Sequence, residues 1–158
     1  IEGPGGALEA FTEAKRSGRV RHIGVTGHHD PDILSQAVQA WPVDAVMLPV
    51  NPAEAVLGGF LDGTLPLARE KGVAVIGMKI LGGSHYVRPG SGLSAELLVR
   101  FALTQGITVA IVGCATAGEV EELTRAACHP SPLSPEEQEA VQEAFRPHAR
   151  RLAFYRKP

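Results

Sequence analysis

The chain has 158 residues, a length typical of one domain, and its composition of 44% hydrophobic and 20% charged residues is that of a globular protein. The formal net charge of -2 gives no general reason to expect a nucleic acid or an anionic membrane as a partner. Two cysteines are too few for a disulfide scaffold, and no apolar run approaches the roughly 18 residues that a membrane span requires. We therefore expect a cytoplasmic protein that forms a single domain over residues 1–158.

The pattern of the sequence predicts one helix, then four strand–helix pairs, then one further helix. The strands are predicted from short apolar, β-branched runs over residues 20–25, 43–48, 73–76 and 107–112. The main helices are predicted from apolar spacing and end signals over residues 7–15, 31–41, 65–70, 94–105, 117–127 and 134–145. This alternation is typical of a parallel sheet with right-handed crossovers. Four such strands form either an open sheet or half of an eight-stranded barrel.

Two motifs predict capped helix starts. Asn51 followed by Glu54 resembles a capping box that opens a short turn of helix, and Thr116 with Glu119 forms one for the helix over residues 117–127. Between the third strand and its helix, residues 82–92 predict a long loop of the kind that often carries function.

The basic residues at the end of the chain predict a solvated tail. They are Arg146, Arg150, Arg151, Arg156 and Lys157. Nucleic-acid binding would need aromatic or basic support elsewhere, which the sequence does not offer.

The functional hypothesis centres on residues 70–83. A helix stop at Lys71 and Gly72 precedes the buried strand, and Lys79 then places a charge at the carboxyl end of that strand. In parallel α/β folds, ligands bind at this end of the strands. Gly82 and Gly83 allow a sharp turn or a close approach of the backbone to a ligand.

Six segments, in order, resemble the carboxyl-terminal half of an aldo-keto reductase. They are residues 3–10, 21–28, 44–51, 72–83, 111–114 with 119–123, and 132–137. The resemblance covers nearly the whole chain. It implies an α/β fold, namely the half of a TIM-type (β/α)8 barrel that holds strands five to eight with their flanking helices, without the amino-terminal half.

The resemblance also implies a function. Aldo-keto reductases transfer a hydride from a nicotinamide cofactor, usually NADPH, to an aldehyde or ketone. Their catalytic Asp, Tyr, Lys and His lie on earlier strands than those present here. The resemblance therefore implies the cofactor-binding half of a carbonyl oxidoreductase, with no catalytic residue of its own and with a dinucleotide and a small carbonyl compound as partners.

At the first three strand ends, the resemblance implies contacts with the nicotinamide. Thr26 stands where the family usually has a Ser that binds the carboxamide, and Gly27 replaces the usual Asn. Met47 takes the place of a Gln, and Met78 takes that of an aromatic residue that stacks under the nicotinamide. A thioether can lie against a flat ring, although a Met on a barrel strand commonly fills the core instead.

The remaining implied contacts are with the diphosphate and the adenosine. Lys79 and Leu81 match positions that flank the diphosphate, and the backbone amides at Gly82 and Gly83 could cradle phosphate. The other implied cofactor residues follow the last strand and are Gly113, Cys114, Ala115, Thr116, Glu119 and Glu122.

The choice between NADP and NAD stays open. In NADPH-specific relatives, basic residues at the positions of Gly113 and Glu119 hold the 2′-phosphate. The capping box with Thr116 explains Glu119 without any ligand, and a carboxylate beside a phosphate is unfavourable. NADP is thus the cofactor that the resemblance implies, with NAD as the alternative. Glu122 matches a family residue near the adenine.

Two residue clusters have simpler explanations than a reactive site. His28, His29 and Asp30 look like metal ligands, but neighbouring loop residues rarely point at one ion and Asp30 caps a helix. We expect no metal site and place His28 at the substrate mouth. Cys114 is either a thiol with a lowered pKa or a small buried apolar residue, and the second interpretation is favoured.

Two other classes of function stay open. Lys79 at the end of a barrel strand could form a Schiff base, as in aldolase-type lyases. A receiver-like ligand-binding module of similar length needs carboxylates at carboxyl strand ends, whereas Asp44 lies at the amino end of its strand. Finally, an open half-barrel has two unpaired edges, which favours self-association.

Overall fold

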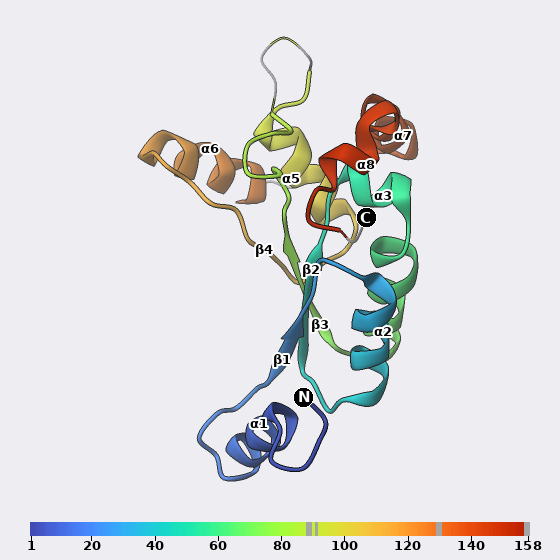
Figure 1. Ribbon diagram of the computed structural model, residues 1–158. Helices are drawn as coiled ribbons and strands as arrows, with labels where there is room; N and C mark the ends of the chain where they lie inside the picture. The colour runs from blue at the N-terminus through green and yellow to red at the C-terminus, as the bar shows by residue number, and fades with distance from the viewer. Residues whose placement is uncertain (88–89, 91, 129–130, 157–158) are drawn as a thin grey trace.

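The computed structural model describes residues 1–87, 90, 92–128 and 131–156, and a four-stranded parallel sheet lies at its centre (Figure 1). The strands follow one another across the sheet in chain order, and every neighbouring pair is parallel. They are β1 (Gly24–Thr26), β2 (Ala45–Pro49), β3 (Ala74–Met78) and β4 (Val109–Ala110). A sequential order of parallel strands is the arrangement found in a (β/α)8 barrel.

Helices connect the strands as the alternating pattern predicts. The α-helices are α1 (Ala7–Arg16), α2 (Pro31–Ala40), α3 (Pro52–Leu57), α4 (Leu65–Glu70), α5 (Ala95–Thr104), α6 (Ala117–Cys128), α7 (Pro135–Phe145) and α8 (Ala149–Leu152). A π-helix, η1 (Phe60–Thr64), runs into α4, and a 3-10 turn, η2 (Arg146–His148), joins α7 to α8. Within the described ranges, none of these helices has the length and apolar character that crossing a membrane requires.

The helix starts confirm most of the predicted caps. The Asp30 side chain accepts hydrogen bonds from two amides at the start of α2, as predicted. At the start of α7 the structure adds a reciprocal capping box between Ser134 and Glu137. The capping box predicted for α3 is only half present. The Asn51 side chain accepts from the Glu54 amide at 3.1 Å, but the Glu54 carboxylate is buried and does not return the bond.

The outer strands are shorter than predicted. β1 begins at Gly24 rather than at residue 20, and β4 covers two residues of the predicted run 107–112. Each of these strands has a single neighbour in the described sheet, so ladder hydrogen bonds form on one side only. Pairing nevertheless continues beyond β4, because the Ile111 amide donates to Gly77 O at 2.9 Å.

One face of the sheet packs on helices and the other does not. Val46, Leu48 and Val75, each at most 2% exposed, join the core with residues of α2, α4 and α5. Figure 1 shows α2 and α3 on the same side of the strands. On the opposite face, Met47 is half-buried and Val109 is 48% exposed. A receiver-like module needs helices on both faces of its sheet, so this arrangement argues against that alternative.

The solvated tail that the basic residues predicted is present in part, because Arg146, Arg150 and Arg151 are exposed. After α8, residues 153–156 return to the carboxyl end of the sheet, where Tyr155 is 7% exposed. The Arg156 side chain is only 10% exposed and pairs with Glu54. Lys157 lies outside the described residues.

Candidate functional site

The carboxyl ends of the strands form one rim, and strand register decides which side chains share a face there. Thr26 pairs with Met47, and Pro49 pairs with Met78. Register partners in parallel strands point to the same side, and so do residues two apart on one strand. Thr26, Met47 and Met78 therefore lie on the same face of the sheet, the one that the helices leave uncovered.

The rim is long rather than compact. Thr26 ends β1 at one edge, and Gly113 follows β4 at the other edge. Three strand spacings separate these edges, a span of about 14 Å. Thr26 and Gly113 thus cannot meet at one small group, and only an extended ligand could contact both.

A pocket of about 390 Å³ brings together segments that are distant in the sequence. It includes four of the predicted cofactor residues, Leu81 from the loop after β3 and Gly113, Glu119 and Glu122 after β4. The other residues that line it are Ser84, Val87, Ser94, Ala95 and Leu123.

The start of α6 confirms the predicted capping box. The Glu119 carboxylate accepts from the Ala115 amide at 2.6 Å and from the Thr116 amide at 3.3 Å. In return, the Glu119 amide donates to the Thr116 hydroxyl oxygen at 3.2 Å. Cys114, just before this helix, is exposed, so the expectation that it is buried was wrong. The exit of edge strand β4 lacks the cover that would bury it.

Lys79 has an unusual backbone conformation that its neighbours hold in place. Its φ of 58° lies in the left-handed region, which is uncommon for a residue with a side chain. The Asn51 side-chain amide donates to Lys79 O at 3.1 Å and to the Tyr155 hydroxyl at 2.9 Å. The Lys79 ammonium lies 5.8 Å from the centre of the Tyr155 ring, a cation–π contact.

The segment around Tyr155 also covers the two histidines after β1. Nδ1 of His28 and Nδ1 of His29 each lie 3.3 Å from Tyr155 O, and the His28 ring meets the Tyr155 ring edge-on. His28 is thus in contact with the carboxyl-terminal segment. In the parts of the chain that the structure describes, no three or more His, Cys, Asp or Glu side chains are grouped so as to hold a metal ion.

Sequence patterns did not identify the buried ion pair beneath this segment. Glu54 is fully buried, and neither of its carboxylate oxygens has a hydrogen-bond partner among the described residues. Burial raises the pKa of the Glu54 carboxyl, and the charge of Arg156, whose Nη1 is 3.3 Å from Oε2, opposes this rise. Arg156 also donates to Gly58 O at 3.0 Å and lies over the Phe60 ring. A lone Glu within the largely apolar run 52–60 was the available signal.

The predicted glycines have different structural roles. Gly82 and Gly83 have φ values of 54° and 63°, a conformation that favours glycine. Gly82 is buried, and a Cβ there would overlap the Tyr86 ring, so packing explains it. Gly83 is exposed, and a Cβ there would lie 3.8 Å from the His85 ring, an ordinary contact distance. At Gly27, a Cβ would meet Leu34 at 3.3 Å.

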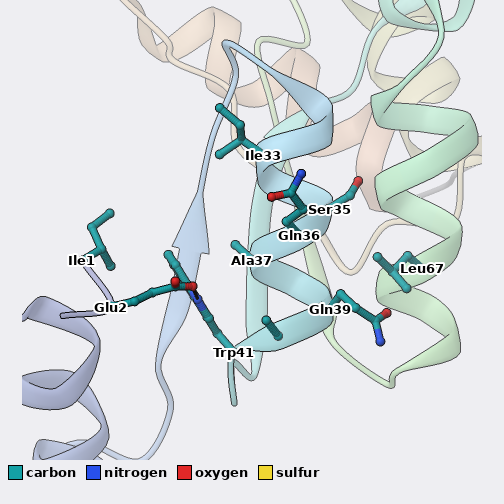
Figure 2. Close-up of a pocket in the computed structure, with 10 residues that line it drawn as sticks. Ile1, Glu2, Ile33, Ser35, Gln36, Ala37, Gln39, Trp41 and Leu67 are labelled. Carbon is teal, nitrogen blue, oxygen red and sulfur yellow. Dashed lines mark hydrogen bonds between the residues drawn. The ribbon is translucent and has the colours of Figure 1, made fainter.

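A wider groove lies away from these residues and has fewer titratable side chains. Its volume is about 810 Å³, and it runs between the start of the chain and α2 (Figure 2). Trp41 Nε1 donates to Glu2 Oε1 at 2.5 Å at its edge. Glu2 is the sole titratable side chain among the described residues that line this groove. The smaller pocket on the rim is therefore the better candidate.

Comparisons with known proteins support the fold. No protein-family model matches the sequence, and a search of curated proteins found no significant match. Solved structures do match. The holo form of aldo-keto reductase AKR11C1 from Bacillus halodurans superposes with a TM-score of 0.62 and 17% identity, covering 96% of this chain and 56% of that one. An aldo-keto reductase from Klebsiella pneumoniae in complex with NADP and acetate gives 0.62 and 18%, covering 88% and 53%.

These likenesses define the class of fold. The chain has the fold of half an aldo-keto reductase barrel, which confirms the predicted half of a (β/α)8 barrel. It spans between 53% and 60% of the lengths of the matched chains from Bacillus halodurans and Klebsiella pneumoniae. At such low identity the likeness concerns the fold and not the activity.

Proposed function

We propose that this chain is the carboxyl-terminal, cofactor-binding half of a carbonyl oxidoreductase that uses a nicotinamide dinucleotide. In this proposal the whole protein transfers a hydride between the cofactor and a small aldehyde or ketone. The acid–base residues lie on strands that precede Ile1, and this chain supplies binding and orientation of the cofactor.

The observation that supports the proposal most is the placement of the predicted residues along one rim. Thr26, Met47 and Met78 share the uncovered sheet face, and a pocket beyond β4 includes four more of the predicted residues. The spacing of these two groups fits an extended ligand. The matched Klebsiella pneumoniae structure is itself a complex with NADP, which agrees with a dinucleotide at this rim.

Each part of the rim has a distinct role in the proposal. The bound cofactor would supply the hydride. The Thr26 hydroxyl is suited to hydrogen-bond a carboxamide, and the Met78 thioether can lie against the nicotinamide ring. The Lys79 ammonium would pair with the diphosphate. Residues beyond β4 would then hold the adenosine.

Binding of NADH and NADPH, measured by calorimetry, tests the proposal directly. Met78→Asp should weaken dinucleotide binding by about tenfold or more, because it places a charge where a flat ring should stack. Phe11→Asp is the matched control, since Phe11 is 59% exposed on α1, which lies near the opposite end of the sheet from α5 (Figure 1). Equal losses in both variants, or no binding to the parent chain, would count against the proposal.

The placement of the catalytic residues has its own test. The 158-residue chain should bind a dinucleotide but reduce no aldehyde or ketone with NADPH or NADH. Joining it to the strands encoded upstream should restore reduction. Clear turnover by the chain alone would show that the acid–base residues are not where the proposal places them.

A Schiff-base lyase is the alternative that Lys79 keeps open. Lys79 does follow β3 at the carboxyl end of the sheet, as that chemistry requires. The Tyr155 ring, whose centre lies 5.8 Å from Nζ, stabilises a cation at this position, whereas a nucleophilic lysine must be a free amine. Borohydride reduction in the presence of a carbonyl substrate would trap an adduct on Lys79 if the lyase hypothesis were correct.

The uncovered sheet face agrees with a missing half-barrel. β1 and β4 each have one neighbour in the described sheet, and Val109 and Ile111 are each 48% exposed. We propose that further strands of the whole protein cover this face, and that the isolated chain self-associates through its edges. Both cysteines are free and exposed, which fits the proposed cytoplasmic location.

A further inference from the structure

The pocket beyond β4 has walls that suit the adenosine end of a dinucleotide. Leu81, Val87 and Leu123 supply apolar side chains, and Ser84 and Ser94 supply hydroxyls. Its volume of about 390 Å³ lies within the range of small-molecule sites. Apolar walls with a few polar groups are what a flat heterocycle and its ribose require.

The charge of this pocket is wrong for a phosphate. Glu119 and Glu122 both line it, and none of the described residues that line it is a Lys or an Arg. A phosphate monoester carries between one and two negative charges at neutral pH. Two nearby carboxylates repel such a group, and the repulsion is felt most at low ionic strength.

The start of α6 gives a second, independent reason. Backbone amides at a helix start commonly bind an anion. Here the amides of Ala115 and Thr116 already donate to Oε2 of Glu119, and the Glu119 amide donates to the Thr116 hydroxyl. The chain's own carboxylate thus occupies the position that a phosphate would take.

The positive charge that could pair with a diphosphate, that of Lys79, lies outside this pocket. Lys79 is at the end of β3 and contacts the Tyr155 ring, and it does not line this pocket. A dinucleotide that placed its diphosphate near Lys79 would therefore put an uncharged group, and not a further phosphate, between Glu119 and Glu122.

We propose that this pocket selects a dinucleotide whose adenosine ribose has free hydroxyls, so that the chain binds NAD(H) in preference to NADP(H). The inference rests on the proposed function. Oε1 of Glu119 accepts no hydrogen bond from the described residues, which leaves it available to a ribose hydroxyl. Acidic residues select NAD in this way in other dinucleotide folds. Glu119 is the main specificity-determining residue, and Glu122 adds to the repulsion.

Paired ligands that differ by one phosphate test the inference. Calorimetric titration of the chain at low ionic strength compares NADH with NADPH, and 5′-AMP with adenosine 2′,5′-bisphosphate. We expect the ligand without the 2′-phosphate to bind about tenfold more tightly in each pair, and this ratio to shrink as salt is added.

Charge-neutral variants identify the residue responsible. Glu119→Gln removes the charge but keeps a side chain that can complete the capping box. It should tighten binding of the 2′-phosphorylated ligands several-fold and weaken 5′-AMP binding, because the charged acceptor for the ribose hydroxyl is lost. Glu121→Gln is the control, because Glu121 is an exposed carboxylate of the same helix that does not line the pocket. Glu121→Gln should not change the ratio of the affinities for the ligands without and with the 2′-phosphate.

The outcomes separate the inference from the proposed function. NADPH binding as tightly as NADH, or more tightly, would overturn the inference and leave the proposed function standing. An equal effect of Glu119→Gln and Glu121→Gln would overturn the role of Glu119. Failure of both dinucleotides to bind would overturn the proposed function and the inference together.

Discussion

Replacement of Arg156 tests the buried ion pair that ties the end of the chain to the rim. In Arg156→Met, the stem that covers Phe60 is largely kept and the charge is lost. The variant removes the ion pair with Glu54 at 3.3 Å, the hydrogen bond to Gly58 O at 3.0 Å, and the cation–π contact. Because Glu54 is fully buried, its carboxylate is left without a partner. Breaking a buried pair in this way costs about 3–5 kcal/mol.

The assay is urea unfolding followed by circular dichroism, with the free energy of unfolding compared between variants. A double variant, Glu54→Gln with Arg156→Met, separates the unpaired charge from the other lost contacts. It should be at least about 1 kcal/mol more stable than Arg156→Met alone, because no buried charge remains. A loss below about 1 kcal/mol in Arg156→Met, or no recovery in the double variant, would refute the reasoning.

The same pair predicts how stability depends on pH. Since burial raises the pKa of Glu54 in the folded state, the folded chain binds more protons than the unfolded chain between the ordinary and the raised value. The contribution of Glu54 to the free energy of unfolding is therefore fully present below its unfolded pKa and is lost as pH rises through its folded pKa. Glu54→Gln should remove this part of the pH dependence, and an unchanged profile would contradict it.

Two further predictions concern other parts of the fold. The pKa of Asp44 is lowered mainly by hydrogen bonds from the Lys15 ammonium and, to a smaller extent, by one from a backbone amide. Asp44 therefore stabilises the fold above its unfolded pKa, and this stabilisation is lost as pH falls through the lowered folded value. In Lys15→Met, carboxyl-carbon NMR titration should show a higher Asp44 pKa, and an unchanged value would contradict the assignment. Gly82→Ala should lower the free energy of unfolding, measured in urea, by about 2–4 kcal/mol, because it adds left-handed strain and overlaps the buried Tyr86 ring. Gly83→Ala adds the strain without a close neighbour and should lower it by about 1–2 kcal/mol. Equal losses in the two variants would show that the Tyr86 contact is unimportant.

The sequence by itself determined the order of elements and the fold class. Hydrophobic runs of strand length alternated with capped helical spacing, and these local signals depend only on neighbouring residues. Asp30 and Thr116 both cap helices as predicted, because each side chain bonds to amides within the next few residues. The resemblance to aldo-keto reductases added the expectation of a half-barrel, which the structural likeness confirms.

Tertiary structure alone decided what the local signals left open. The register of β1, β2 and β3 placed Thr26, Met47 and Met78 on one face, and a shift of one residue would have reversed that face. Glu54 was predicted to cap its helix, but its buried carboxylate forms an ion pair with Arg156, about a hundred positions later in the sequence. Cys114 is exposed because an edge strand lacks a neighbour, and Arg156 is covered because the chain folds back over the rim. Each of these outcomes depends on contacts between residues far apart in the sequence, and short-range patterns carry no information about such contacts.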